Sequence, residues 1–326
     1  MIIARSPLRM SFVGGGSDLP SFYREHGGAV ISTAIDKYVY VTINKKFDDS
    51  LRVSYSRTEE VDTVDELEHP IVREALRMLE ITGGLEITSV ADIPARGTGL
   101  GSSSTFAVGL LHALYAYKGR FASASLLAEQ SCELEIGRLR EPIGKQDQYA
   151  AAHGGFNLIE FNPDDTVSVE PIVAMPETLA QLNRRTLVFY TGITRSASAI
   201  LSNQNEAVKS NRDKQEVLKR MVQLAFDLRH ELQDNRLNNF GEILDANWRL
   251  KTQLTDGIST SAIDDWYARA RKAGASGGKL LGAGSGGFLM FYAPEELHDT
   301  IAAALPELRR VQFGFERRGS MIIFVH

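Results

Sequence analysis

Cysteine is almost absent from this sequence, in which Cys132 is the only one. A single cysteine excludes an internal disulfide framework and a metal site built from several cysteines. Proteins that keep their thiols reduced are typical of the cytoplasm. We therefore expect a cytoplasmic protein without a cysteine-based metal centre.

Positive charge is not in excess, and long hydrophobic runs are missing. The 36 lysines and arginines are outnumbered by 41 aspartates and glutamates, for a net charge of -5, whereas nucleic-acid-binding proteins usually carry a basic excess. No apolar run approaches the ~20 residues of a membrane span. Residues 1–7 lack the charged and apolar regions of a signal peptide. These absences predict no nucleic-acid partner, no membrane segment and no export, and they still allow a local basic pocket for a phosphorylated substrate.

The composition that is present, 43% hydrophobic and 24% charged, is that of an ordinary globular protein. A chain of 326 residues is long enough for two domains or for one domain with a lobed core. Helical and strand patterns are mixed in both halves, which indicates the α+β class. We place a domain boundary in a stretch interrupted by three prolines, giving segments 1–172 and 173–326. Nothing in the sequence marks an oligomer interface.

Hydrophobic spacing and β-branched runs predict the individual elements. We expect strands at residues 30–44, 84–90, 155–161, 166–172, 185–190, 279–281, 288–292, 311–317 and 321–325. We expect helices at residues 70–81, 106–117, 123–139, 196–211, 213–233, 237–250, 261–273 and 295–305. Ser123 is a candidate N-cap for the third of these helices.

The most informative segment is Pro94-Ala-Arg-Gly-Thr-Gly-Leu-Gly-Ser-Ser-Ser-Thr105, between a predicted strand and an apolar helix. Glycines let the backbone approach a ligand closely, and a helix N-terminus attracts phosphate. We predict that ATP phosphates bind here, although a flexible turn that merely caps the helix is the alternative. The predicted phosphate-binding residues are Gly97, Gly99, Leu100, Gly101, Ser102, Ser103 and Ser104.

Motifs of other nucleotide-binding and catalytic families are either absent from the sequence or occur in the wrong structural context. No GxxxxGK[ST] segment of a P-loop and no HRD or DFG triplet of a protein kinase occurs. Residues 282–287 fit the dinucleotide pattern GxGxxG, but a strand rather than a helix is predicted to follow. Residues 274–278 fit the GxSxG nucleophile elbow, but they follow a helix and precede a strand, which is the wrong order.

Two carboxylates stand out, one inside the helix predicted at 123–139 and one beyond its end. Glu135 and Asp147 lie twelve residues apart across a proline–glycine break, so they can face one site from separate helices. Phosphoryl transfer needs a metal, positioned charge and a group that orients or deprotonates the attacking hydroxyl. We interpret the neighbouring Glu133 and Glu141 as solvated helix positions.

Three segments, in order, resemble the motifs of the GHMP kinases. They are Arg5-Ser-Pro-Leu-Arg-Met-Ser-Phe-Val-Gly-Gly-Gly-Ser-Asp18, the Gly99-Leu-Gly-Ser-Ser-Ser104 run, and Lys279-Leu-Leu-Gly-Ala-Gly-Ser-Gly-Gly-Phe-Leu289. The resemblance spans nearly the whole chain. It implies a two-lobed α+β fold with a ferredoxin-like C-terminal lobe, and an active site between the lobes. It also implies ATP as the phosphoryl donor and Mg²⁺ as the cofactor.

The resemblance also assigns roles to single residues. Ser103 and Glu135 would bind Mg²⁺, and Asp147 would be the catalytic carboxylate beside the acceptor hydroxyl. Arg9 would keep that carboxylate ionised and stabilise charge in the transition state. For Arg9 and Asp18, an ordinary surface arginine and a turn aspartate are the alternatives.

The acceptor site is expected to contain residues from several segments. The predicted substrate-binding residues are Gly15, Gly16, Ser17, Asp18, Lys145, Arg195 and Gly284. Galactokinases carry an acidic residue at the position of Gly15, so its loss leaves a roomier and less negative pocket that suits a larger or anionic substrate. Arg195 follows a strand and precedes a helix, so it is either a contact for the distal end of the substrate or part of a capping turn.

The segment Pro142-Ile-Gly-Lys-Gln-Asp-Gln-Tyr149 most resembles the corresponding segment of family members that phosphorylate D-glycero-D-manno-heptose 7-phosphate. The resemblance therefore implies transfer of phosphate to the anomeric (C1) hydroxyl of a small-molecule sugar phosphate. A kinase for a neutral sugar such as fucose is the runner-up. The same fold could also host a lyase or a non-catalytic sensor, and the intact set of Arg9, Ser103, Glu135 and Asp147 disfavours a sensor.

Overall fold

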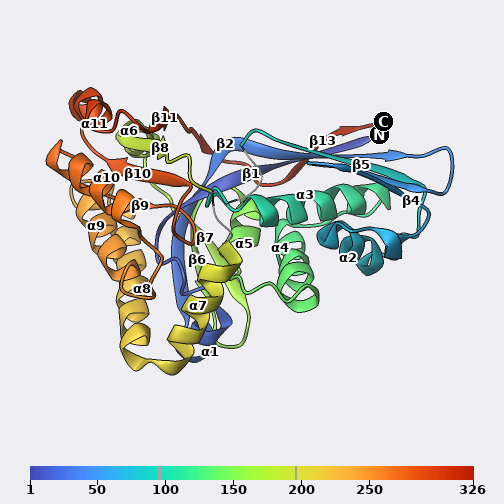
Figure 1. The fold of residues 1–326 in the computed structure, drawn as a ribbon, viewed down its shortest axis with the longest axis horizontal. Coiled ribbons are helices and arrows are strands. Elements are labelled where there is room, and N and C mark those ends of the chain that lie inside the picture. Colours follow the sequence, from blue (N-terminus) through green and yellow to red (C-terminus); the bar gives the residue numbers. More distant parts are fainter. Residues whose placement is uncertain (94–96, 195–196) are drawn as a thin grey trace.

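The structure is a computed structural model that describes residues 1–93, 97–194 and 197–326 (Figure 1). Its helices and strands are organised around two sheets, as the α+β prediction requires. The predicted Arg195 and the first residues of the Pro94 segment lie outside the described residues. No helix of the described ranges combines the length and the apolar character that crossing a membrane demands.

The larger sheet is built mainly from the first half of the chain. Among the described residues it contains nine strands, in the order β13-β1-β2-β5-β3-β4, with β6 and β12 also paired with β2, and β7 paired with β6. The strands are β1 (Ile2–Val13), β2 (Gly28–Lys45), β3 (Leu51–Ser54), β4 (Thr58–Val61), β5 (Leu85–Ala91), β6 (Phe156–Phe161), β7 (Val167–Pro171), β12 (Phe315–Glu316) and β13 (Met321–Val325). The β-branched and aromatic run predicted as one long strand forms β2, which pairs with β1, β5, β6 and β12.

Helices cover one face of this sheet (Figure 1). They are α2 (Pro70–Met78), α3 (Ser102–Tyr117), α4 (Ala124–Cys132) and α5 (Gln146–His153), whereas α1 (Pro20–His26) lies against α7 (Ala197–Ser210). The central one, α3, lies against β1 and β2 and is apolar along most of its length, so it is buried between the sheet and α4 and α5. Its N-terminus carries the three serines and follows directly on the glycine loop.

The smaller sheet has the order β11-β8-β10-β9, with every pair antiparallel. Its strands are β8 (Thr186–Tyr190), β9 (Gly277–Leu280), β10 (Phe288–Tyr292) and β11 (Arg309–Val311). The associated helices are α6 (Pro176–Arg184), α7 (Ala197–Ser210), α8 (Arg212–Gln233), α9 (Phe240–Lys251), α10 (Ser261–Lys272) and α11 (His298–Ala303). Helices follow β8 and β10, so the chain order and the strand order confirm the predicted ferredoxin-like lobe.

The end of the chain returns to the first sheet. The prediction of a single strand at 311–317 is wrong. This part of the chain contains two short strands, because β11 pairs with β8 in the smaller sheet and β12 pairs with β2 in the larger one. β13 then pairs with β1, so the N- and C-termini lie side by side (Figure 1). The division of the chain after residue 172 stays a prediction, and these two returning strands tie the second segment to the sheet of the first.

Candidate active site

The glycine–serine loop ends directly at the N-terminus of α3. Gly101 is the residue before the helix and has a left-handed φ of 76°. The first turn of α3 has no side-chain cap among the described residues. The helix begins at Ser102, four residues earlier than predicted, so all three serines lie in its first turn. The hydroxyl oxygen of Ser102 is buried and has no hydrogen-bond partner in the described ranges. Uncapped helix N–H groups and a free hydroxyl are what a phosphate group requires.

The second glycine segment holds this loop in place by close backbone contact. A Cβ atom added to Gly99 would lie 2.3 Å from the Leu281 carbonyl oxygen, and one added to Gly282 would lie 2.3 Å from the Gly99 Cα. Only glycines allow the two backbones to approach so closely. Gly284 packs against Ile258, whose Cα would lie 2.8 Å from an added Cβ; its predicted role in substrate binding stays a prediction.

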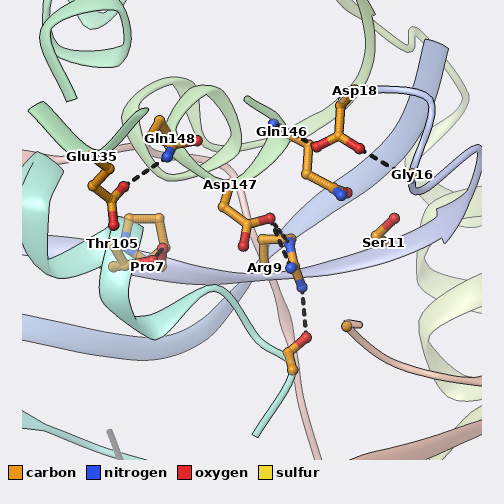
Figure 2. A network of polar contacts seen from close by, with 12 residues as sticks. Pro7, Arg9, Ser11, Gly16, Asp18, Thr105, Glu135, Gln146, Asp147 and Gln148 are labelled. Atoms are coloured by element: carbon orange, nitrogen blue, oxygen red, sulfur yellow. Dashed lines mark hydrogen bonds and ion pairs between the residues drawn. The ribbon is translucent and has the colours of Figure 1, made fainter. Parts of the chain in front are cut away.

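Arg9 and Asp147 meet beside the phosphate loop (Figure 2). Arg9 Nε donates to Asp147 Oδ1 at 2.8 Å, and its Nη2 lies 2.7 Å from the same oxygen. Arg9 Nη1 donates to the Gly99 carbonyl at 2.8 Å. A Cβ atom on Gly101 would lie 3.1 Å from Asp147 Oδ2. The arginine therefore joins the carboxylate to the loop, and the two residues share one site as the sequence predicted.

The second predicted carboxylate, Glu135, lies behind the first turn of α3. It is carried by a π-helical turn, Glu133–Arg138, which interrupts the single helix expected at 123–139. The predicted cap of that helix is confirmed, because the Ser123 side chain accepts a hydrogen bond from the Leu126 N–H at 3.2 Å. π-helical turns are frequent at functional sites.

Hydrogen bonds fix the carboxylate of Glu135 on both oxygens. Ser103 Oγ donates to Oε1 at 3.0 Å, and Gln148 Nε2 donates to Oε2 at 2.7 Å. Burial raises the pKa of Glu135 to about 7, since removal from water disfavours the charged form more than the hydrogen bonds favour it. A cation bound at this carboxylate would reverse that balance.

The Glu135–Ser103 pair fits a magnesium ion better than a transition metal. Mg²⁺ prefers oxygen ligands and usually takes one or two carboxylates together with water and substrate phosphates. No group of three or more His, Cys, Asp or Glu residues suited to a metal occurs within the ranges that the structure describes. A site completed by nucleotide phosphates is therefore the arrangement that these side chains support.

The turn after β1 positions Asp18. Its Oδ1 accepts from the Gly16 N–H at 3.0 Å, and its Oδ2 accepts from the Gln146 N–H at 3.2 Å. Burial, and then the nearby charge of Asp147, raise the pKa of Asp18. A Cβ atom on Gly144 would lie 1.9 Å from Asp18 Oδ2, so that glycine makes room for the carboxylate.

Two predicted substrate residues have partners within the protein. Ser17 Oγ donates to the Gly14 carbonyl at 2.8 Å and accepts from the Ala29 N–H at 3.1 Å, so it holds the turn. Lys145 Nζ donates to the Asp165 carbonyl at 2.9 Å and lies 4.8 Å from the centre of the Tyr23 ring. Their roles toward a substrate stay predictions.

Several polar residues near this turn were missed by the sequence reasoning. They are Ser11, Gln146, Gln204 and Lys251. Gln204 is fully buried without a described partner on either amide atom, and a Cβ on Gly16 would lie 2.3 Å from its Nε2. Gln146 stands next to the predicted catalytic Asp147, which was a usable signal. Gln204 and Lys251 come from helices far along the chain and have no local pattern.

Taken together, a glycine–serine loop at an uncapped helix N-terminus and an Arg–Asp pair beside it, in a two-lobed α+β fold, are the arrangement expected of a small-molecule kinase. The GHMP kinases N terminal domain matches residues 70–155, and the GHMP kinases C terminal domain matches residues 228–309. The chain belongs to the GHMP kinase family. It is an enzyme that takes a phosphoryl group from ATP and transfers it to a hydroxyl group.

Individual relatives show the same likeness over the whole chain. D-glycero-alpha-D-manno-heptose 7-phosphate kinase of Campylobacter jejuni is 28% identical over 98% of this chain and 97% of its own length. The bifunctional fucokinase/GDP-fucose pyrophosphorylase of Arabidopsis thaliana is 27% identical over 89% of this chain, which spans only 29% of that protein. A crystal structure of a D-glycero-D-manno-heptose 1-phosphate kinase from Bacteriodes thetaiotaomicron superposes over 100% of both chains, with a TM-score of 0.83 and 24% identity, which shows the shared fold.

Proposed function

We propose that this enzyme transfers the γ-phosphoryl group of ATP to the anomeric (C1) hydroxyl of D-glycero-D-manno-heptose 7-phosphate, which gives the 1,7-bisphosphate. The observation that carries the kinase chemistry is the Arg9–Asp147 pair beside the uncapped N-terminus of α3. The full-length similarity to the Campylobacter heptose 7-phosphate kinase supports the choice of acceptor.

In the proposed reaction the acceptor hydroxyl attacks the γ-phosphorus. Asp147 takes the hydroxyl proton on Oδ2 while the new O–P bond forms and the bond to the β,γ-bridging oxygen breaks, with its electrons leaving on ADP. Arg9 holds the carboxylate through Oδ1 and places its positive charge between Asp147 and the phosphate loop. This arrangement lets one arginine both orient the base and offset charge on the transferred group.

The phosphates of ATP would lie on residues 97–104, where the helix N–H groups and the Ser102 hydroxyl are free to donate among the described residues. Ser103 and Glu135 would hold Mg²⁺ there. When bound, the ion offsets the charge of the phosphates and orients them. Gln148 and the π-helical turn then serve to keep Glu135 facing the loop.

A second candidate acceptor is a neutral sugar such as fucose, which the similarity to the Arabidopsis fucokinase favours. ADP release measured with heptose 7-phosphate, free heptose, fucose and galactose distinguishes the two. We expect the highest kcat/KM with heptose 7-phosphate. Equal or higher kcat/KM with a neutral sugar would replace the proposed acceptor, and CO₂ release without a phosphorylated sugar would indicate a lyase instead.

A further inference from the structure

The proposed acceptor carries a phosphate dianion, which needs a cationic partner on the protein. The sequence predicts two cations for this purpose. Lys145 is engaged with Asp165, and Arg195 lies outside the described residues. We propose that Lys251 binds the phosphate of the sugar-phosphate acceptor and thereby sets the preference for a phosphorylated substrate. This inference rests on the proposed function.

Lys251 is the last residue of α9, which packs against β9 of the smaller sheet and β1 of the larger one. The residue is 5% exposed, and its Nζ donates to the Gly282 carbonyl at 2.7 Å. An ammonium group has three N–H donors. Within the described residues this carbonyl is its one hydrogen-bond acceptor, and Lys251 has no ion pair there, so two donors are available for a ligand.

The Lys251 ammonium lies close to Gly15, where polar groups from β1 and α5 are also found. A Cβ atom added to Gly15 would lie 3.8 Å from Lys251 Nζ, 3.6 Å from Ser11 Oγ and 3.8 Å from Gln146 Nε2. We call these four residues the Gly15 cluster. Ser11 Oγ, a hydroxyl that can donate, is a buried atom without a hydrogen-bond partner in the part of the chain that the structure describes. Buried polar atoms are almost always paired, so an unpaired hydroxyl beside the Lys251 ammonium indicates a bound polar ligand.

The Gly15 cluster lies on the acceptor side of the site. Figure 2 shows Ser11 and Gln146 on one side of the Arg9–Asp147 pair and Glu135 on the other. Because the metal and nucleotide phosphates are assigned to the Glu135 side, a ligand at the Gly15 cluster is the acceptor. The absence of a side chain at Gly15 leaves space in front of the ammonium.

Charge favours a phosphate over a hydroxyl as the partner of Lys251. Burial lowers the pKa of Lys251 to about 8, and Arg9 adds to this, while Asp18 and Asp147 act in the opposite direction. The group therefore stays mainly protonated near neutral pH but lacks solvation. A phosphate dianion replaces the lost hydration of the Lys251 ammonium far better than a neutral hydroxyl does, because hydrogen bonds between charged groups are stronger.

Lys279 is a second buried lysine in the same region, and its ammonium is hydrogen-bonded to the backbone. Its Nζ donates to the Ser11 carbonyl at 2.8 Å and to the Phe12 carbonyl at 3.1 Å, so it joins β9 to β1. Two backbone acceptors give it a structural role. Lys251 has one within the described residues, which distinguishes it as the ligand-binding lysine of the two.

The test compares wild-type enzyme with Lys251→Met, at saturating ATP, on heptose 7-phosphate and on free heptose. Because a hydrogen-bonded charge contact contributes ~1.5–3 kcal/mol, we expect kcat/KM for the phosphorylated sugar to fall about 10- to 100-fold, mainly through KM. Activity on free heptose should fall much less, so the ratio of the two kcat/KM values reports the phosphate contact. The control is Lys219→Met, which removes an exposed lysine on α8 and should leave both values unchanged. Equal losses on both sugars, or no loss, would overturn the proposal.

A second measurement separates this inference from the proposed function and from a folding defect. Inorganic phosphate is tested as an inhibitor against free heptose in the wild type, in Lys251→Met and in the milder Lys251→Gln. Competitive inhibition that weakens in both variants, with ATP affinity retained, supports a phosphate site at Lys251 even if heptose 7-phosphate is not the preferred sugar. Absence of phosphate inhibition in the wild type, or unchanged inhibition in the variants, overturns it.

Discussion

Arg9 binds a single oxygen of Asp147. Both its Nε and its Nη2 reach Oδ1, at 2.8 Å and 2.7 Å, and neither is paired with Oδ2. The second oxygen, Oδ2, lies next to Gly101, at the start of α3. The side chain of Asp147 is 24% exposed, whereas that of Arg9 is 4% exposed. One carboxylate oxygen is thus held by the protein, and the second is open toward the place where phosphates would bind.

The first prediction concerns this open oxygen. Asp147→Asn keeps the shape of the side chain and removes the base, so we expect kcat to fall by roughly 10²–10⁴. ATP affinity, measured by calorimetry, should change little because the loop contacts remain. The matched control is Asp164→Asn, in the exposed turn between β6 and β7. Near-normal turnover of Asp147→Asn would mean that positioning alone drives the transfer.

The second prediction separates two glutamates of the same π-helical turn. Glu135→Gln removes the charge that would hold Mg²⁺, so the Mg²⁺ concentration for half-maximal rate should rise about tenfold or more. Glu133→Gln is the control, because the Glu133 side chain is 57% exposed and forms a surface ion pair with Arg138. A Mg²⁺ requirement that is the same in both variants would rule out Glu135 as a ligand.

The third prediction uses two glycines with nearly the same backbone angle. Gly282 and Gly257 have φ values of 81° and 83°, but an added Cβ meets the Gly99 Cα at 2.3 Å in the first case and, among the described atoms, nothing within 4 Å in the second. Both alanine variants carry the cost of a left-handed residue, on the order of 1 kcal/mol. Only Gly282→Ala should also raise the KM for ATP, because it displaces the phosphate loop.

A steady-state titration with ATP measures this difference. An increase of about tenfold in Gly282→Ala, with little change in Gly257→Ala, is the expected result. Equal KM values in the two variants would mean that the contact between the two glycine segments does not position the loop.

The fourth prediction concerns pH. Lys251 must be protonated to attract a phosphate, and its pKa is lowered to about 8. The charged neighbours are Asp18, Asp147 and Arg9, with Lys279 also close enough to interact. The substrate phosphate is already a dianion above about pH 7, since its second pKa is ~6. The kcat/KM for heptose 7-phosphate should therefore fall as the pH rises through about 8, when the ammonium of the free enzyme loses its proton.

The pH profile of Lys251→Met is the corresponding control. This variant should lack the decline near pH 8, because it has no group to deprotonate there. A decline that persists unchanged in the variant would assign the ionisation to a different residue.

Local signals account for the features that the sequence predicted well. The strand–loop–helix pattern predicted the glycine–serine loop before α3, and the ordered motifs predicted that Arg9 and Asp147 lie close together. Periodicity found the hairpin β6–β7 and most helices, but β1, β3, β4, α1, α5 and α6 were not predicted. Boundaries moved where a glycine or serine turn joined a helix, as at Ser102.

Features that depend on long-range packing were not predictable in this way. Lys251 ends an ordinary amphipathic helix, and only the tertiary fold brings its ammonium to Gly15. The pairing of β12 and β13 with the first sheet likewise depends on partners about 300 residues away. No pattern within a short window carries that information.

Identification of the product is the most direct test of the proposed reaction. Purified enzyme is incubated with ATP, Mg²⁺ and D-glycero-D-manno-heptose 7-phosphate, and the mixture is followed by ³¹P and ¹H NMR. We predict stoichiometric ADP and a new phosphate monoester coupled to the anomeric proton, with the 7-phosphate resonance retained. Phosphate appearing on a carbon other than C1, or ADP release without a sugar bisphosphate, would contradict the proposed reaction.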